Sequence, residues 1–211
     1  HCYALDVSDR PAYENVVEQV SQATERMDVV INNAGIGDGE LFGNYAMDQW
    51  EKMVNVNLLG TYYGSRLLLP LLERRGGLII NIASAAGFMN APGMSAYNAT
   101  KAAVYSLSET LHHEFKRTNI QISVAAPTFF QTNIMSKAHG SQPFIRFAEN
   151  QMKHSSTNAD EMAEIILSEA AVGKFLIVHP KEARRNMWIK RYFPGLVSKK
   201  FEKLLAKLTR D

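Results

Sequence analysis

The segment "GLIINIAS" (77–84) is an apolar run of strand length that ends in a serine. Continuous apolar runs of this length are typical of strands that are buried on both faces of a parallel sheet. The segments "DVVINNAG" (28–35) and "IQISVAAP" (120–127) share this pattern, and "CYALDV" (2–7) and "GKFLIVH" (173–179) also have the pattern of strands. We therefore expect a strand at each of these places.

Helical patterns alternate with the expected strands. Apolar residues recur at helical spacing in 11–26, and 47–75, 95–117 and 160–171 also have helical patterns. This alternation predicts an α/β fold with a doubly wound parallel sheet that is covered by helices on both faces. In such folds ligands bind at the carboxyl ends of the strands, so polar residues that follow the strands are the first candidates for a site.

The composition suits a single globular domain. The 211 residues are 46% hydrophobic and 21% charged, and no apolar run reaches the ~18 residues that a membrane span needs. The single cysteine, Cys2, excludes an internal disulfide and a thiolate zinc site, and the histidines lack ligand spacing. We expect a cytoplasmic protein without a metal.

The charge divides the chain in two. Residues 181–211 carry ten Lys or Arg against three acidic residues, so residues 1–180 are net acidic. We expect an α/β core over 1–180 and a basic helical extension over 181–211. The core has no basic stripe or recognised nucleic-acid module, so no nucleic-acid partner is expected.

The extension is amphipathic. "LVSKKFEKLLAKLTR" (196–210) places apolar residues on one helical stripe among lysines, and Trp188, Tyr192 and Phe193 precede it. A basic amphipathic helix with aromatic neighbours can lie on an anionic membrane surface, which indicates peripheral membrane association. The stripe can equally pack on the core or on a partner subunit, with solvated lysines. The sequence leaves both readings open.

One helix carries a tyrosine and a lysine four residues apart. Tyr97 and Lys101 in "SAYNATKAAV" (95–104) lie on the same helical face. A nearby ammonium group favours the phenolate, and therefore lowers the pKa of a tyrosine. The pair can act in acid–base chemistry, or it can be a packing tyrosine beside a solvated lysine.

Four motifs together resemble the short-chain dehydrogenases/reductases. They are "NNAG" (32–35), "NVNLLG" (55–60), "IINIASAAG" (79–87) and "YNATK" (97–101), and the resemblance runs from about residue 2 to 179. It implies a Rossmann-like fold and an enzyme that uses NADP or NAD to interconvert a hydroxyl and a carbonyl group. Each motif is weak alone, but their order and spacing are specific.

The resemblance assigns four catalytic roles. Tyr97 is the general acid and base, and Lys101 lowers its pKa and contacts the nicotinamide ribose. Ser84 donates a hydrogen bond that orients the substrate oxygen. Asn57 holds a water that relays protons between Lys101 and solvent.

The same resemblance assigns the cofactor contacts. Thr128 stands where the family has a glycine, so the loop after Pro127 departs from the family pattern. The residues implied to contact the cofactor are Asp6, Val7, Asn33, Ala34, Gly35, Tyr97, Lys101, Pro127 and Thr132.

The family's glycine-rich loop, which holds the pyrophosphate, is expected one strand–helix–strand–helix unit before "CYALDV". The sequence starts at His1 without it, so the N-terminal part of the fold is expected to be missing. The residue that selects NAD or NADP lies in the same part, and the choice stays open. A non-enzymatic nucleotide-sensing or interaction protein on the same fold is the alternative hypothesis.

Apolar, Met-rich segments at 87–94 and 133–152 flank the expected site. They fit a hydrophobic alcohol or ketone, although ordinary packing explains them equally well. The candidate substrate contacts are Phe88, Met94, Phe144 and Phe147.

The helices 47–75 and 95–117 correspond to those that pair between subunits in this family. A homodimer or homotetramer is therefore expected. Five leucines can form part of that surface or can cover their own sheet. They are Leu67, Leu68, Leu71, Leu107 and Leu111.

Overall fold

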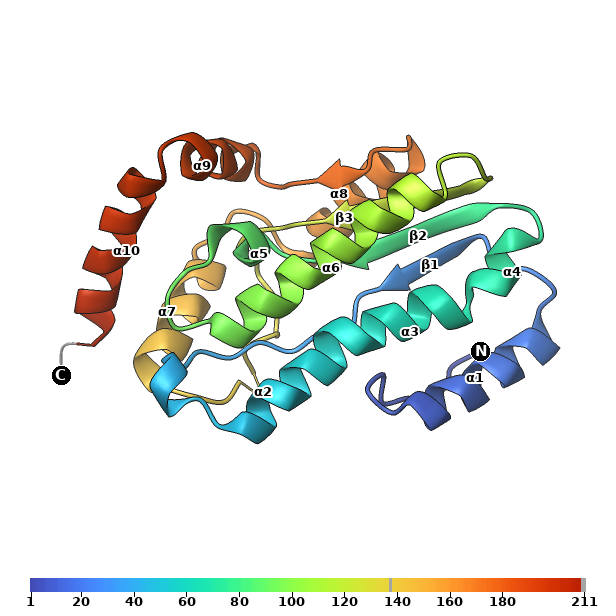
Figure 1. The fold of residues 1–211 in the computed structure, drawn as a ribbon, viewed down its shortest axis with the longest axis horizontal. Coiled ribbons are helices and arrows are strands. Elements are labelled where there is room, and N and C mark those ends of the chain that lie inside the picture. The colour runs from blue at the N-terminus through green and yellow to red at the C-terminus, as the bar shows by residue number, and fades with distance from the viewer. Residues whose placement is uncertain (137, 210–211) are drawn as a thin grey trace.

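The computed structural model describes residues 1–136 and 138–209. Lys137, in the predicted apolar segment 133–152, and residues 210–211, at the end of the predicted basic extension, lie outside the described residues. A parallel sheet forms the centre of the fold (Figure 1). Its strands lie in chain order and are β1 (Val29–Asn32), β2 (Gly77–Ile82), β3 (Ile120–Ala125) and β4 (Leu176–Ile177).

Helices connect the strands and continue beyond them. The α-helices are α1 (Arg10–Ala23), α2 (Met47–Val54), α3 (Gly60–Leu67), α4 (Leu69–Glu73), α5 (Ala86–Met89), α6 (Ser95–Glu114), α7 (Gln142–Lys153), α8 (Ala159–Ala171), α9 (Lys181–Tyr192) and α10 (Pro194–Leu208). A short 3₁₀ helix, η1 (Phe42–Asn44), precedes α2, and a π-helical turn, η2 (Asn55–Leu59), joins α2 to α3.

Buried side chains explain the continuous apolar strands. Ile79 and Ile122 pack with Leu72 on the face that α4 and α6 cover. Ile80 points to the opposite face, where it packs with Ile166 of α8. Alternate residues of β2 therefore enter two different hydrophobic clusters, which confirms the doubly wound sheet.

The parallel register brings the carboxyl ends of the strands to one edge. Asn32 lies opposite Asn81, and Ile82 lies opposite Ala125. The segments that follow β1, β2 and β3 therefore leave the sheet at the same edge, as the fold class predicts.

The predicted strand at 2–7 is wrong. These residues form no strand, and among the described residues β1 has a hydrogen-bonded neighbour on one side only, β2. A strand requires a partner for its backbone groups, and an apolar pattern cannot supply one. The backbone N–H and the hydroxyl of Ser8 instead donate to Asp6 Oδ1, and a turn leads to α1, whose first turn Asp9 caps.

The predicted long helix 47–75 is interrupted twice. The π-helical turn η2 lies between α2 and α3. Helix α3 then ends at Leu67, and α4 begins at Leu69. Pro70 lies in the first turn of α4, where its missing N–H costs no hydrogen bond. The helix predicted over 95–117 is continuous from Ser95 to Glu114.

The leucines proposed for a subunit interface lie on these helices. Leu71 is buried, and Leu68 and Leu111 pack against the cluster around Ile79. These three side chains therefore help to cover their own sheet. Leu67 and Leu107 are half-buried.

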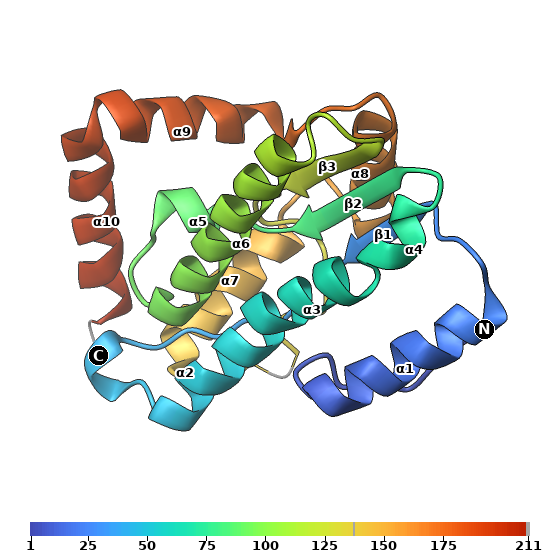
Figure 2. The same ribbon diagram turned by 45° about the vertical axis from the view of Figure 1, so that its right-hand side comes forward.

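The basic extension forms two helices. Helices α9 and α10 lie beyond the carboxyl ends of the strands (Figures 1 and 2). They separate at Phe193, the residue before Pro194, where the helical conformation is disfavoured. Within the described part of the chain, no helix combines the length and the apolar character that crossing a bilayer requires.

Candidate active site

Helix α6 presents Tyr97 and Lys101 from its first two turns. The Lys101 ammonium lies 5.8 Å from the centroid of the Tyr97 ring. It donates a hydrogen bond of 2.8 Å to the carbonyl oxygen of Ile82, the last residue of β2. Lys101 is 3% exposed, and Tyr97 is half-buried. The lysine is therefore fixed at the end of β2 and is not a solvated surface charge.

Ser84 follows β2 and lies at the same end of this strand as Lys101. Its Oγ accepts from the backbone N–H of Ala86 at 3.1 Å, and its hydroxyl lies 3.4 Å from the carbonyl oxygen of Pro127. These contacts hold Ser84 between the start of α5 and the end of β3. Ser84 also lowers the pKa of Tyr97, which makes the two side chains neighbours. The structure thus brings Ser84, Tyr97 and Lys101 together.

Burial controls the protonation of this cluster. Desolvation raises the pKa of Tyr97, and the neighbouring Ser84 opposes that rise without cancelling it. Desolvation also lowers the pKa of Lys101 to about 8. The direction for Tyr97 is opposite to the one predicted from the neighbouring lysine, because the cost of burying a phenolate outweighs the attraction of that ammonium group. The phenol of Tyr97 therefore holds its proton at neutral pH.

Asn57 lies in the π-helical turn η2 and is fully buried. Its amide binds the backbone of Ile36 in both directions: Ile36 N–H donates to Oδ1 at 2.8 Å, and Nδ2 donates to the Ile36 carbonyl at 3.0 Å. Its own carbonyl accepts from Thr61. In this arrangement Asn57 fastens the loop after β1 to the helix, and π-turns of this kind are frequent at functional sites.

Gly35 leaves room beside the lysine. A Cβ atom at this position would lie 3.3 Å from Asn57 Oδ1 and 3.4 Å from Lys101 Nζ. Either contact is tight, so a larger side chain would push against the two polar groups. The glycine keeps a small space next to the Lys101 ammonium, and a ligand that reaches the lysine from this edge can use it.

The other residues predicted to contact the cofactor after β1 lie on an open edge. Asn33 and Ala34 are exposed, and with Val7 they line a hollow of about 60 Å³. Ligand pockets usually have ~300–1,000 Å³, so this hollow alone cannot enclose a dinucleotide. Asp6 is also exposed, and its two hydrogen bonds from Ser8 lower its pKa.

The loop after β3 accommodates its departure from the family pattern. Thr128 donates its N–H to the carbonyl of His179 at 3.0 Å, while the carbonyl of Pro127 accepts from Ala85. Among residues 1–136 and 138–209, Asn90 is the only non-glycine residue with positive φ. Thr128 therefore needs no left-handed conformation. Thr132 is half-buried farther along the loop.

The predicted substrate contacts differ in their surroundings. Phe144 is 5% exposed and packs against Gly39 and Gly93, where an added Cβ would clash with it. Phe88 packs with the cluster of Ala126, Val178 and Ala183. These two side chains serve the packing of the fold, whichever ligand the site takes.

Phe147 and Met94 are partly exposed, as a side chain that contacts a substrate must be. Phe147 is half-buried and lies edge-on to Phe129, with 6.3 Å between the ring centroids. Met94 is half-buried at the N-terminus of α6, three residues before Tyr97. Both lie on segments that flank the Tyr97 cluster along the chain.

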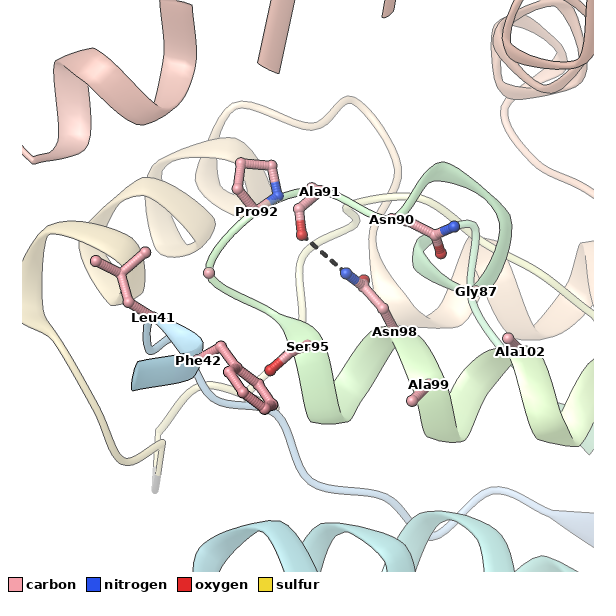
Figure 3. Close-up of a pocket in the computed structure, with 11 residues that line it drawn as sticks. Leu41, Phe42, Gly87, Asn90, Ala91, Pro92, Ser95, Asn98, Ala99 and Ala102 are labelled. Atoms are coloured by element: carbon pink, nitrogen blue, oxygen red, sulfur yellow. Dashed lines mark hydrogen bonds between the residues drawn. The ribbon is translucent and has the colours of Figure 1, made fainter. Parts of the chain in front are cut away.

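A larger cavity lies on a different side of α6 and was not predicted. Figure 3 shows its lining, which includes Ser95, Asn98 and Ala102 of α6, and its volume is about 560 Å³. Asn98 Nδ2 donates to the carbonyl of Ala91 at 2.8 Å. None of the four predicted catalytic residues lines it. Its small side chains gave no sequence signal, because alanines on a helix are equally typical of packing.

A buried polar chain supports the site and was only partly predicted. Asn32 Nδ2 donates to Asn81 Oδ1 at 2.8 Å, and Asn81 Nδ2 donates to Ser108 Oγ at 3.0 Å. The chain of hydrogen bonds joins β1, β2 and α6. Asn81 and Ser108 could have been suspected, because polar residues stand there within otherwise apolar segments.

These observations define a doubly wound α/β protein with a tyrosine, a lysine and a serine gathered at the carboxyl edge of its sheet. A family model described as short chain dehydrogenase matches residues 1–142. The chain belongs to the short-chain dehydrogenase/reductase family.

Curated relatives agree with this membership. The chain is 35% identical over 136 residues to the 3-oxoacyl-(acyl-carrier-protein) reductase FabG of Thermotoga maritima, with 64% of this chain and 55% of that protein covered. It is 33% identical over 182 residues to an uncharacterized oxidoreductase of Staphylococcus aureus (strain USA300), with 86% and 71% covered. The chain thus spans about half the length of the first of these relatives.

Solved structures show the same fold. A short-chain dehydrogenase/reductase from Burkholderia phymatum in complex with NAD aligns with a TM-score of 0.83 at 24% identity, over 90% of this chain and 74% of that one. A short-chain dehydrogenase from Streptomyces avermitilis aligns with a TM-score of 0.78 at 25% identity, over 99% and 80%.

Proposed function

We propose that this chain carries the acid–base centre of an NAD(P)-dependent oxidoreductase that interconverts a hydroxyl and a carbonyl group on a hydrophobic small molecule. The observation that carries the proposal is the meeting of Ser84, Tyr97 and Lys101 at the end of β2, where the buried Lys101 lies beside the Tyr97 ring and donates to the carbonyl of Ile82. The family membership and the oxidoreductase names of the relatives support it.

The cofactor proposed is NAD or NADP, which supplies or accepts the hydride when it is bound. Gly35 and Lys101 fit the nicotinamide ribose, since the glycine leaves space beside the ammonium group. The other proposed cofactor contacts lie along the same carboxyl edge of the sheet and are Asn33, Ala34, Pro127 and Thr132. Asp6 and Val7 are proposed to contact the adenine. The solved relatives in complexes with NAD and with NADP+ support this choice.

Ser84 and Tyr97 have different roles in the proposed reaction. Ser84 donates a hydrogen bond to the substrate oxygen and orients the carbonyl group. Tyr97 gives its proton to that oxygen as negative charge develops on it, and its raised pKa keeps the proton available at neutral pH. In the oxidative direction Tyr97 must accept a proton, and the charge of Lys101 favours the phenolate that does so.

Lys101 and Asn57 complete the proposed proton path. Lys101 stays charged below a pKa of about 8, and its ammonium group can replace the proton that Tyr97 has given away. Asn57 is proposed to hold the water that links Lys101 to solvent. Its side chain is already bound to Ile36, so this role falls to its backbone carbonyl, which accepts from Thr61 and has a second lone pair.

The proposed substrate is a hydrophobic ketone or alcohol. The half-buried side chains of Met94, Phe129 and Phe147 offer apolar surface on the loops that flank Tyr97. The Thermotoga maritima relative is named a 3-oxoacyl reductase, which is a ketone reductase for an acyl substrate. A homodimer or homotetramer through α3 and α6 is proposed as the assembly, and Tyr62 on α3 is exposed and available to it.

The test is turnover of hydrophobic ketones with NADH and with NADPH. Tyr97→Phe removes the proton donor and keeps the ring, and we expect a loss of ~10²–10⁴-fold in kcat. Tyr105→Phe, on the same helix, is the matched control and should retain the activity. A loss of less than about threefold in Tyr97→Phe, or no turnover by the wild type with either cofactor, would contradict the proposal.

A further inference from the structure

Helix α9 has an inner face that fastens it to the core. Ala183 is buried beside Ala126 and Val178, and Met187 packs against the same cluster. Lys190 Nζ donates to the carbonyl oxygens of Phe88 and Met89 at the end of α5, at 2.5 and 2.9 Å. These three residues recur at helical spacing, so the orientation of α9 on the core is fixed.

The opposite face of α9 is aromatic and basic. Trp188 is 62% exposed and Tyr192 is 55% exposed, and their ring centroids lie 4.3 Å apart. The exposed Arg184 and Arg191 stand one turn before and one turn after Trp188. Because the inner face already contacts the core, these aromatic rings cannot turn inward without breaking the contacts of Lys190 and Met187.

The exposed apolar surface continues around the bend into α10. Phe193 and Leu196 are 55% and 63% exposed. We call Trp188, Tyr192, Phe193 and Leu196 the aromatic patch. The apolar stripe of α10, which begins with Val197 and Phe201, is half-buried and not fully covered. The stripe of α10 is therefore more covered than the aromatic patch.

Positive charge surrounds the patch. Residues 182–209 carry eight Lys or Arg, whereas Glu182 and Glu202 are their only acidic residues. The ion pairs found between described residues all lie outside α9 and α10. With Lys190 bound to α5, the remaining cations of this segment are exposed to solvent.

We propose that the aromatic patch and the cations around it form a binding surface for anionic phospholipid bilayers. Trp and Tyr favour the boundary between water and hydrocarbon, because each has an apolar ring and a polar group. Lys and Arg close to an anionic leaflet gain attraction from its surface potential. Leu196 and the half-buried stripe add aliphatic surface, which suits acyl chains better than it suits the phosphates of a nucleic acid.

The aromatic patch lies at the same edge of the sheet as the candidate active site. Helix α9 is bound to α5, which begins two residues after Ser84. A bilayer on the patch would therefore lie at the carboxyl edge of the sheet, where the candidate active site is also found (Figure 2). The surface itself is proposed independently of the proposed enzymatic activity, and its test does not use turnover.

The test uses Trp188 as its own reporter. The chain has two tryptophans, and Trp50→Phe leaves Trp188 as the single one. The probes are vesicles of phosphatidylcholine alone and vesicles in which half of it is phosphatidylglycerol. We expect co-sedimentation and a blue shift of Trp188 fluorescence with the anionic vesicles, and little of either with the neutral vesicles or at high salt.

Two variants separate the contributions, and a third is the control. Removing two charges with Arg184→Gln and Arg191→Gln should weaken binding by about fivefold for each charge. Trp188→Ala with Tyr192→Ala should also weaken binding, because the two aromatic rings can no longer insert into the bilayer surface. Lys116→Gln with Arg117→Gln removes the same charge from exposed positions beyond the C-terminal end of α6 and should leave binding unchanged. All of these side chains are exposed, so folding is expected to be preserved.

Three outcomes would overturn the proposal. The first is the absence of a blue shift and of co-sedimentation with anionic vesicles at low salt. The second is equal weakening by the control variant, which would make the attraction a property of total charge. The third is a blue shift that appears without vesicles as protein concentration rises, which would place a second copy of the chain on the patch.

Discussion

The Tyr97 cluster and the edge around β1 differ in how the chain holds them. Lys101 and Asn57 are buried, and each is bound to the backbone of another segment. At the edge, Val29 and Ile31 are 44% and 47% exposed, although they belong to a strand of the sheet. The residues proposed for chemistry are thus positioned by contacts within the described chain, whereas those proposed for the adenine end of the cofactor lie on open surface.

After the loss expected for Tyr97→Phe, the comparison predicts the next largest effect on turnover at Lys101. Lys101→Met keeps the length of the side chain but removes the charge that favours the Tyr97 phenolate. We expect kcat to fall by ~10²-fold or more, at the lower end of what acid–base groups contribute. Lys116→Met, at an exposed position just beyond the C-terminal end of α6, serves as the control. Equal kcat values for Lys101→Met and the control would mean that Lys101 takes no part in the chemistry.

A smaller effect is expected from the buried polar chain beneath the cluster. Asn81→Ala would remove one of the two hydrogen bonds that Asn32 Nδ2 donates and the one that Ser108 Oγ accepts from Asn81, both in a buried setting. The expected loss is about 1–3 kcal/mol in the free energy of unfolding, which denaturant titration can measure. Asn33→Ala on the open edge is the matched control, with an expected change within about 0.5 kcal/mol. Equal losses in both variants would remove the contrast between the two regions.

The buried carboxyl group of Asp38 makes the stability of the protein depend on pH. It is 5% exposed, Tyr45 donates to one of its carboxylate oxygens, and the other has no partner among the described residues. Burial and the charge of Glu40 raise the pKa of Asp38 from 3.8 to about 6. Between these values the folded protein keeps a proton that the unfolded chain has lost, so Asp38 reduces stability as pH rises through this window.

Asp38→Asn should therefore stabilise the protein only above the window. We expect a gain of about 1–2 kcal/mol at pH 8, which is part of the ~3 kcal/mol that a shift of this size represents. Well below pH 3.8 the carboxyl group is protonated in both the folded and the unfolded wild type, and the gain should vanish. Thermal denaturation at the two pH values measures this difference. A gain that is the same at both values would rule out the carboxylate as its cause.

The smallest effect is expected on the open edge itself. Asp6 is exposed and bonds only to the neighbouring Ser8. Asp6→Ala should change the free energy of unfolding by no more than about 0.5 kcal/mol. Its effect should appear in the KM for the cofactor, with kcat preserved, because the adenine lies far from the reacting atoms. A change in kcat with an unchanged KM would move Asp6 out of the cofactor contacts.

The sequence predicted the parts of the fold that depend on local pattern and burial. The strands at 77–82 and 120–125 and the helix from Ser95 to Glu114 are confirmed, because their apolar residues enter clusters that the pattern itself implies. The strand at 2–7 is wrong, because a strand depends on a neighbour and not on its own residues. The break at Phe193 could have been read from Pro194.

The details of the site depended on contacts between distant segments. Phe144 packs on Gly39 and Gly93, which are far from it in sequence, so its burial could not be predicted from local pattern. The binding of Lys190 to α5 was not predicted for the same reason. The motif residues Ser84, Tyr97 and Lys101 could be predicted together because their order and spacing follow a family pattern.

The central claim is that Tyr97 and Lys101 form an acid–base pair that the cofactor completes. Ultraviolet difference titration of the wild type against Tyr97→Phe isolates the ionisation of this one phenol, with and without bound oxidised NAD or NADP. In the free protein the pKa of Tyr97 should lie above its ordinary value, since burial dominates. The positive charge of the oxidised nicotinamide should lower it markedly. A Tyr97 pKa that is at or below its ordinary value in the free protein, or that does not move when the cofactor binds, would contradict the claim.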